Sequence, residues 1–357
     1  MIGRLRVGFF TIIDGQSQYY EDIKRRIMLN FNNIELEFAF ETIRKATLLV
    51  KQVQAEMITP AMTKDDRSPV TIGDLAAQAL VGRLISLSFP GIPLVAEEDS
   101  SALRKPEGKE TLDQVTYFVK HFIAEADSSA VCDWIDYGQS APGSRFWTLD
   151  PIDGTKGYLR GDQYAVALAL VVDGRVQVGV LGCPNLSDGC RPEINGLGSL
   201  VVAARDHGTW RTSLTAPGAF ERMLVSDRHD PAQMRILRSY EGEHTNVSQI
   251  DQLAQRLNVQ AEPVLMDSQA KYAVLACGEG DLIIRLLSPA KPNYREKIWD
   301  QAAGSLIVEE AGGRITDLTG KPLDFTTGRN LTNNRGILAS NGLLHPAVIK
   351  ALEEIKA

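Results

Sequence analysis

The chain has 357 residues, 44% of them hydrophobic and 23% charged, with a formal net charge of −7. This length suits one large or two smaller lobes of an ordinary soluble globular protein. No lysine or arginine cluster relieves the negative charge. Binding to nucleic acid or a membrane through a basic face is therefore not expected, and a phosphorylated substrate must be met by local positive groups or metal ions.

The N-terminal residues 1–33 are predicted to be an appendage of unknown role. Their short apolar run, Val7–Ile13, is interrupted by Gly8 and Thr11 and lacks a small-residue cleavage site, so a signal or transit peptide is only weakly indicated. Met28 is an alternative natural start. No run of 18 apolar residues occurs, so we expect no membrane span and a cytoplasmic protein, with organelle targeting by the appendage left open.

The first lobe, residues 34–220, is predicted to combine helices with a meander of antiparallel strands. Apolar residues at helical spacing predict a long helix over Leu36–Met57. A second helix should begin near Asp74, a candidate N-cap, and Leu94–Asp99 predicts a buried strand that ends in acidic residues. Residues 101–143 form a polar insertion. The remaining expected elements are a helix over Thr111–Ala124 and strands over Gln163–Val172, Arg175–Leu181, Ser199–Arg205 and Thr209–Thr212.

The second lobe, residues 221–357, alternates strands with helices, which predicts an α/β lobe covered on both faces of its sheet. Asp300 lies near the start of one of these helices and is an N-cap by default. The Thr319–Asn334 loop is rich in turn residues and indicates nothing further. The expected strands are Arg222–Val225, Arg235–Ser239, Pro263–Met266, Leu282–Leu287 and Gly336–Ser340. The expected helices open at Pro231 and cover Thr245–Leu257, Gln269–Cys277, Ile298–Ala311 and Pro346–Ile355.

The segment with the clearest chemistry is the central motif, 150–155, which reads Asp-Pro-Ile-Asp-Gly-Thr. The proline stops any helix, and Gly154 permits a tight reversal. Asp150 and Asp153 therefore lie three residues apart across a rigid turn. Such a pair makes a poor core and a good site for a hard cation.

Two further acids are candidates for the same centre. Glu97 follows a predicted strand, where α/β folds place ligands, although a solvated acidic loop is the alternative. Asp300 is the other. Oxygen ligands favour Mg²⁺ or Mn²⁺ over zinc, and the chain's scattered cysteines and histidines form no zinc motif and indicate thiols in a reducing compartment. Clustered carboxylates repel one another, so bringing them together requires cations.

Phosphate-ester hydrolysis suits such a centre because two metal ions can hold the attacking water and the leaving oxygen. Asp74, with a hydroxyl partner such as Thr155, is a candidate to accept the proton of that water. The backbone N–H groups of Gly154 and Thr155 are candidates to hold a phosphate at a helix start.

The central motif, preceded by Glu97-Glu98 and followed by Trp299-Asp300, resembles the lithium-sensitive inositol monophosphatase superfamily over roughly residues 35–357. The resemblance implies an αβαβα sandwich of two lobes, α+β and α/β in class. It implies two or three Mg²⁺ ions and a water-activating pair, Asp74 and Thr155. The metal ligands that it implies are Glu97, Asp150, the backbone carbonyl of Ile152, Asp153 and Asp300. One departure is Ala96, where the family usually has glycine.

Three stretches, Ser68–Asp74, Asp267–Tyr272 and Tyr294–Asp300, resemble the 3'(2'),5'-bisphosphate nucleotidase branch of that superfamily. The long segment between the first and second acidic motifs also fits this branch. The resemblance implies substrate contacts from Gly154, Thr155, His244, Ser268, Lys271 and Arg285. Lysine and arginine could hold a second phosphate in an acidic protein; the alternative for the lysine is an exposed position on a helix.

The expected function is Mg²⁺-dependent hydrolysis of adenosine 3',5'-bisphosphate to AMP and phosphate, with 3'-phosphoadenosine 5'-phosphosulfate as a second substrate. The role would lie in sulfur metabolism, with lithium inhibition implied by the resemblance. The alternatives are an inositol polyphosphate 1-phosphatase or an inositol monophosphatase. A non-catalytic nucleotide sensor is disfavoured because every expected ligand is present. A monomer is expected.

Overall fold

The computed structural model describes residues 33–57, 68–240, 246–288 and 290–356. The first 32 residues of the predicted appendage, with Met28, and the candidate contact His244 lie outside the described residues. Within those ranges, no helix is long and apolar enough to cross a membrane.

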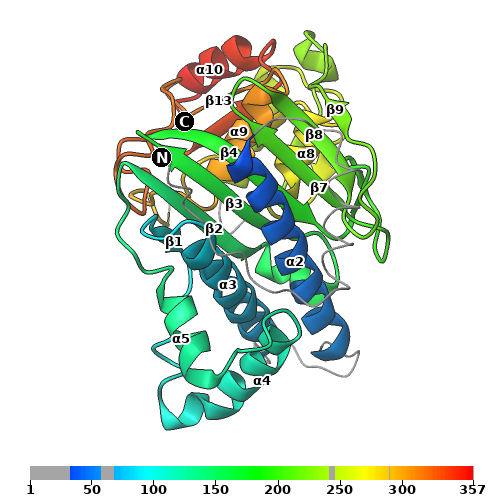
Figure 1. The fold of residues 1–357 in the computed structure, drawn as a ribbon. Helices are drawn as coiled ribbons and strands as arrows, with labels where there is room; N and C mark the ends of the chain where they lie inside the picture. Colours follow the sequence, from blue (N-terminus) through cyan, green and yellow to red (C-terminus); the bar gives the residue numbers. More distant parts are fainter. Residues whose placement is uncertain (1–32, 58–67, 241–245, 289, 357) are drawn as a thin grey trace, which may run out of the picture.

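Two long helices cover one face of a seven-stranded sheet (Figure 1). They are α2 (Ile34–Met57), close to the predicted span, and α3 (Ser68–Ser88). The strand order is β1-β2-β3-β4-β7-β8-β9, and all neighbours are antiparallel except β1 and β2. The predicted meander is therefore confirmed. The strands are β1 (Leu94–Ala96), β2 (Arg145–Asp153), β3 (Ala165–Val172), β4 (Arg175–Cys183), β7 (Ser199–Ala204), β8 (Gly208–Ser213) and β9 (Glu221–Met223).

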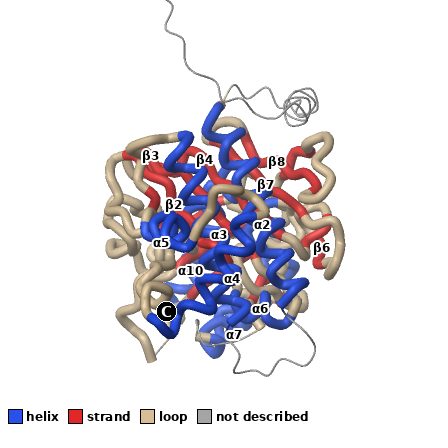
Figure 2. The backbone as a smooth tube through the Cα atoms, turned by 60° about the horizontal axis from the view of Figure 1, so that its bottom comes forward, coloured by secondary structure: helices blue, strands red, loops and turns tan. Residues whose placement is uncertain are grey.

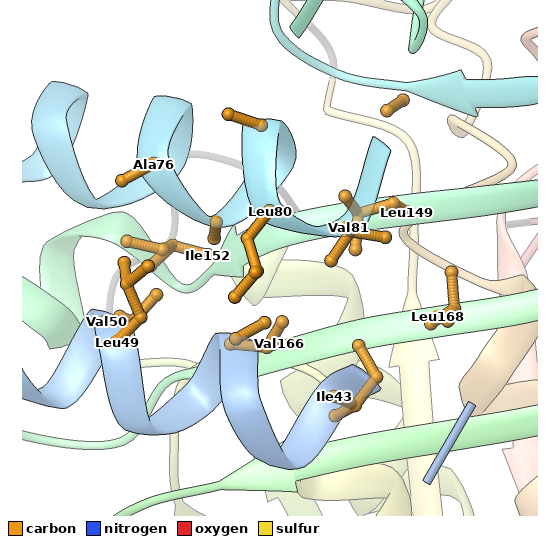
Figure 3. Packing of buried hydrophobic residues seen from close by; sticks show 14 of the residues in the cluster. Ile43, Leu49, Val50, Ala76, Leu80, Val81, Leu149, Ile152, Val166 and Leu168 are labelled. Carbon is orange, nitrogen blue, oxygen red and sulfur yellow. The ribbon is translucent and has the colours of Figure 1, made fainter. Parts of the chain in front are cut away.

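Strand β3 shows how the sheet serves two cores of different character. Its large residues, among them Val166 and Leu168, face α2 and α3, where they pack with Ile43 and Leu80 (Figure 3). Its alternate residues on the other face are mostly alanines and belong to a second core. Small side chains let helix α9 (Ala302–Glu310) pack close to the sheet: a Cβ on Gly179 of β4 would lie 2.8 Å from the Ala303 carbonyl oxygen.

A second sheet of five strands lies beyond α9, in the order β11-β10-β12-β14-β13. Its first three strands are parallel and its last two pairs antiparallel. The strands are β10 (Ile236–Arg238), β11 (Val264–Leu265), β12 (Leu282–Arg285), β13 (Arg314–Thr316) and β14 (Ile337–Ser340). Strand β13 was not predicted.

Helices cover both faces of this second sheet, as expected. Helix α8 (Ala270–Ala276) and α9 share a core with one face. Helices α7 (Val247–Arg256) and α10 (His345–Glu354) share a third core with the other face. The layers therefore run helix, sheet, helix, sheet, helix, which is the αβαβα sandwich that the resemblance implied.

The insertion between the acidic motifs packs on α3. Helix α4 (Lys109–Lys120) matches the predicted helix, whereas α5 (Ser128–Asp136) was not predicted. Figure 2 (helices blue, strands red) shows both grouped with α3. The short elements are η1 (Pro106–Gly108), η2 (Pro231–Gln233), α6 (Thr155–Arg160), β5 (Leu186–Ser187) and β6 (Arg191–Pro192).

Three local features differ from the expectations for single segments; the capping alternatives for Asp74 and Asp300 are those that the site roles implied by the resemblance already replace. Asp74 is not an N-cap but lies within α3, because the helix already opens at Ser68-Pro69, and proline is tolerated in a first helical turn. Asp300 does not cap α9 either, since Gln301 holds that position. Strand β9, expected to open the second lobe, pairs with β8 and ends the first sheet. The division of the chain at residue 220 stays a prediction.

Candidate active site

The central motif forms the end of β2 and the turn into α6. The pairing of β2 with β3 shifts register between Asp150 and Asp153, so the strand is irregular where the acids lie. Gly154 follows with a φ of +92°, and a Cβ there would lie 2.6 Å from the Cβ of Ser268. Glycine is thus needed twice, for the left-handed backbone and for the contact with Ser268.

Helix α3 brings Asp74 to this turn. A Cβ on Gly73 would lie 2.8 Å from Ile152 Cδ1 and 3.3 Å from the Tyr158 hydroxyl, so the helix packs directly on the β2–α6 segment. Asp74 is 6% exposed. Burial raises its pKa well above the usual range, and the charges of Glu98 and Glu97 raise the pKa further.

The five predicted acidic residues lie close enough to repel one another. Asp150 is 2% exposed, and burial is the main cause of its strongly raised pKa. Negative charges contribute next: those that raise the pKa of Asp150 are on Asp153, Glu97, Asp300 and Asp74, in that order. The acids come from α3, the residue after β1, the end of β2 and the segment before α9. The structure thus gathers residues that are far apart in the sequence.

Glu97 differs from the others in being open to solvent. Its carboxylate is nevertheless surrounded by enough protein to raise its pKa to about 7, with desolvation as the largest cause, followed by Glu98 and Asp153. An accessible acid beside buried ones gives the cluster one side that faces solvent.

The donor set fits a divalent metal by its chemistry. Asp150 Oδ1 is buried and has no hydrogen-bond partner, and a buried carboxylate without a partner is costly. Among the described residues, no three His, Cys, Asp or Glu side chains stand as a ready-made metal group. The cluster is therefore one of mutually repelling carboxylates in which one buried oxygen has no partner, which suits a hard cation.

Two cations that were predicted as substrate contacts lie beside the acids. Arg285 Nη1 lies 3.1 Å from the Glu296 carboxylate and 3.7 Å from that of Asp300. Lys271 Nζ donates to Ser239 Oγ at 3.1 Å and to the Met266 carbonyl at 3.2 Å. Burial lowers the pKa of Lys271 to about 8, against the opposing charge of Asp153. Lys271 is half-buried, so the alternative of an exposed helix lysine is wrong.

Burial also raises the pKa of Asp153, and the positive charges of Lys271 and Arg285 oppose that rise. These two predicted substrate contacts are consequently within electrostatic reach of the acidic cluster.

Gln269 is a residue of the site that the sequence did not single out. Its backbone N–H donates to Asp153 Oδ2 at 2.7 Å, and its side chain donates to the Trp299 carbonyl at 3.1 Å. It thereby links the central motif to the segment before Asp300. In the sequence, the only signal for Gln269 is that it follows Ser268, a predicted substrate contact. In the structure, Ser268 is 9% exposed and has a φ of +68°.

Thr155 is exposed at the first position of α6. Tyr158 of the same helix is close enough to Asp74 for that charge to contribute to its raised pKa, after desolvation and Tyr164. The helix therefore neighbours Asp74, while the direct pairing of Thr155 with Asp74 stays a prediction.

Residues 34–357 match the sequence profile described as the Inositol monophosphatase family. This chain belongs to the inositol monophosphatase family. Its members are phosphatases that generally depend on a metal, so the protein is a hydrolase.

Similar family members include several with the same name. The chain is 40% identical over 352 residues to "3'(2'),5'-bisphosphate nucleotidase 1" of Candida albicans, covering 90% of this chain and 95% of that one. It is 41% identical over 339 residues to "3'(2'),5'-bisphosphate nucleotidase" of Oryza sativa, covering 90% and 94%. The resemblance to the nucleotidase branch is thus confirmed.

Solved structures of the family share the fold. An inositol monophosphatase from Anabaena superposes with a TM-score of 0.58 at 22% identity, covering 89% of this chain and 95% of that one. "CysQ from Bacteroides thetaiotaomicron" superposes with a TM-score of 0.56 at 19% identity, covering 86% and 96%.

Proposed function

We propose that this chain is a Mg²⁺-dependent 3'(2'),5'-bisphosphate nucleotidase that hydrolyses adenosine 3',5'-bisphosphate to AMP and phosphate. The observation that carries the proposal is about 40% identity, over nine-tenths of the chain, to relatives with that name in fungi and rice. Lys271 and Arg285 beside the acidic cluster support it. Hydrolysis of the phosphosulfate nucleotide, lithium inhibition and a monomeric state belong to the same proposal.

The metal ligands proposed are Glu97, Asp150, the carbonyl of Ile152, Asp153 and Asp300. A bound divalent cation would balance their charge, polarise the phosphate and lower the pKa of a bound water. The unpartnered oxygen of Asp150 supports this assignment.

The chain's own residues would move the proton. Asp74 is the proposed base, and its burial favours proton uptake because burial disfavours the charged carboxylate. Thr155 would orient the attacking water through its hydroxyl. The N–H groups that open α6 would hold the reacting phosphate, since unpaired donors at a helix start favour anions.

The second phosphate would be held by the cations next to Ser268. Lys271 already binds neutral oxygens, so an incoming phosphate would offer it a stronger, charge-assisted partner. Arg285 lies between Glu296 and Asp300. The planar guanidinium has several N–H donors, which suit the oxygens of a phosphate. His244 completes the proposed set.

A substrate panel with free phosphate as the readout tests the proposal. The full chain with Mg²⁺ would be assayed on both nucleotides, inositol 1-phosphate, inositol 1,4-bisphosphate and fructose 1,6-bisphosphate. We expect kcat/KM to be at least about 100-fold higher for the nucleotides, equal to about 3 kcal/mol of transition-state binding. A preference for an inositol phosphate would contradict the proposal. No hydrolysis of any compound, with nucleotide still bound, would favour the sensor.

Substitutions at the cations test the substrate contacts separately. Lys271→Met and Arg285→Met should raise KM for the bisphosphate at least tenfold, because each removes a charge-assisted bond to phosphate. Lys350→Met, which removes an exposed lysine from α10, is the control and should leave KM unchanged.

A further inference from the structure

Arg329 lies in the loop between β13 and β14. Its guanidinium donates to the backbone carbonyl of Ala96 and, at 3.4 Å, to that of Gly138. It also stacks over the ring of Trp299, with 4.7 Å to the ring centroid. Ala96 immediately precedes Glu97, and Trp299 immediately precedes Asp300.

The backbone fixes the base of this side chain. The amide of Ile298 donates to the Arg329 carbonyl at 3.1 Å, and the amide of Leu331 donates to the Glu296 carbonyl at 2.9 Å. A β-bridge joins the two segments between these bonds. Arg329 is thus held rigidly against the segment that leads to Asp300.

The far end of the side chain is equally fixed. The amide of Ala96 donates to the Gly138 carbonyl at 2.8 Å, so both acceptors of Arg329 belong to one bonded unit at the end of β1. That unit belongs to the first sheet, whereas the base of Arg329 belongs to the loops of the second. One side chain therefore spans the two halves of the acidic cluster.

We propose that Arg329 is a positioning residue: it fixes the backbone before Glu97 and the side chain before Asp300, two acids from opposite halves of the fold that would both bind a divalent metal. This inference rests on the proposed metal centre but not on the identity of the substrate. Residues that orient metal ligands typically change metal affinity 10- to 100-fold when replaced.

A second cation packs on the same ring. Lys297 faces Trp299 at 5.6 Å from the ring centroid, and Arg329 at 4.7 Å. The residue immediately before Asp300 is therefore held by two cationic side chains.

The geometry requires arginine rather than any cation. A guanidinium offers several donors in one plane, so it can serve two carbonyls and stack on an indole together. A lysine would keep the charge but lose the fork.

The test uses the full chain with Arg329→Gln and Arg329→Lys. The matched control is Arg295→Gln, since Arg295 also donates to a carbonyl of these loops, Thr332 at 3.3 Å, without reaching β1. The first readout is the rise in Tm on titration with Mg²⁺ in the absence of nucleotide. The second is the Mg²⁺ concentration for half-maximal phosphate release, with KM for nucleotide measured at saturating Mg²⁺.

We expect Arg329→Gln to need at least about tenfold more Mg²⁺ in both readouts, Arg329→Lys to be intermediate, and Arg295→Gln to match the wild type. KM for nucleotide should change less than threefold. Circular dichroism checks that each variant is folded. If Arg329→Gln does not fold, the test uses Arg329→Lys.

A uniform loss of Tm with unchanged Mg²⁺ response would overturn the proposal, as would a wild type without any Mg²⁺ response. If the wild type responds to Mg²⁺ and Arg329→Gln does not, but no bisphosphate nucleotide is hydrolysed, the positioning role stands and the proposed substrate fails.

Discussion

Asp74 is unusual among the acids of the site in lying in the middle of a long helix. Asp74→Asn should lower kcat by about 10²- to 10⁴-fold, the range for loss of a general base. Tm should stay the same or rise, because the amide removes the cost of burying a carboxylate. Steady-state kinetics and thermal unfolding measure both.

Asp99→Asn is the matched control, because it neutralises an exposed acid of the run that follows β1. It should change kcat less than about threefold. An Asp74→Asn enzyme that retains wild-type kcat would show that another group accepts the proton.

Gly154 gives a second prediction at this scale. Gly154→Ala must strain a left-handed backbone at about 1 kcal/mol and also push Ser268 away from a 2.6 Å contact. Gly161→Ala is a matched control: its φ is +70°, and nothing lies within 4 Å of the added Cβ. We expect both variants to lose stability in urea, and only Gly154→Ala to lose at least about 100-fold in kcat/KM. Equal activities would mean that the contact with Ser268 is unimportant.

The candidate site residues that the sequence singles out share one property: each carries its own chemical signal in a short motif. Asp150 and Asp153 stand in a rigid turn, and Lys271 stands in a stretch resembling known nucleotidases. Gln269 acts on Asp153 through a backbone amide, which any residue has. Arg329 contacts a carbonyl 233 residues away, and nothing local in its turn-rich loop indicates such a partner.

Helix α10 presents a pH-sensitive element far from the acids. His345, its first residue, is 1% exposed and lies between Thr316 Oγ1 and Ser340 Oγ, each 2.9 Å from a ring nitrogen. Desolvation, with the charge of Arg314 second, lowers its pKa from 6.5 to about 4. The start of a helix also disfavours a cation.

Because the folded pKa is the lower one, the unfolded chain binds the proton first. Stability from the neutral ring is complete above pH 6.5 and is lost as the pH falls towards 4, by up to about 3 kcal/mol. His345→Gln should remove this slope. Urea unfolding of both proteins at pH 7 and pH 5 gives the loss of unfolding free energy between the two pH values. The contribution of His345 is the wild-type loss minus the variant loss. An equal change in both proteins would contradict the prediction.

At the level of elements, periodic helices such as α2 were predictable because one face of each is buried along its whole length. Strands β9 and β13, with three residues each, were misplaced or missed. Such short strands are specified by the neighbour that pairs with them rather than by their own sequence. The start of α3 was misjudged because proline there was taken as part of a loop.

At the scale of the whole molecule, a metal ion bound to the acidic cluster would raise the free energy of unfolding, because the cluster forms only in the folded chain. Metal binding to the native state adds about 2.7 kcal/mol of stability at 100 times Kd. We expect Mg²⁺ to raise Tm by on the order of 5 °C and EDTA to reverse the rise and abolish activity. KCl at matched ionic strength is the control for simple screening.

Asp150→Asn sharpens this prediction. It should raise the Tm of the metal-free protein, since it removes a buried charge that has no partner for one oxygen. It should also abolish the response to Mg²⁺. A metal-free variant that is less stable than the wild type would mean that this carboxylate stabilises the fold without a cation.

The contact of Gly154 with Ser268 has a consequence for how this enzyme can diverge. One residue belongs to the turn proposed to hold the reacting phosphate, and the other to the segment proposed to recognise the rest of the substrate. A bulkier residue at 268 would displace the turn as well as reshape the recognition site. Substrate preference is therefore expected to drift at neighbouring positions, such as Lys271, before it drifts at Ser268.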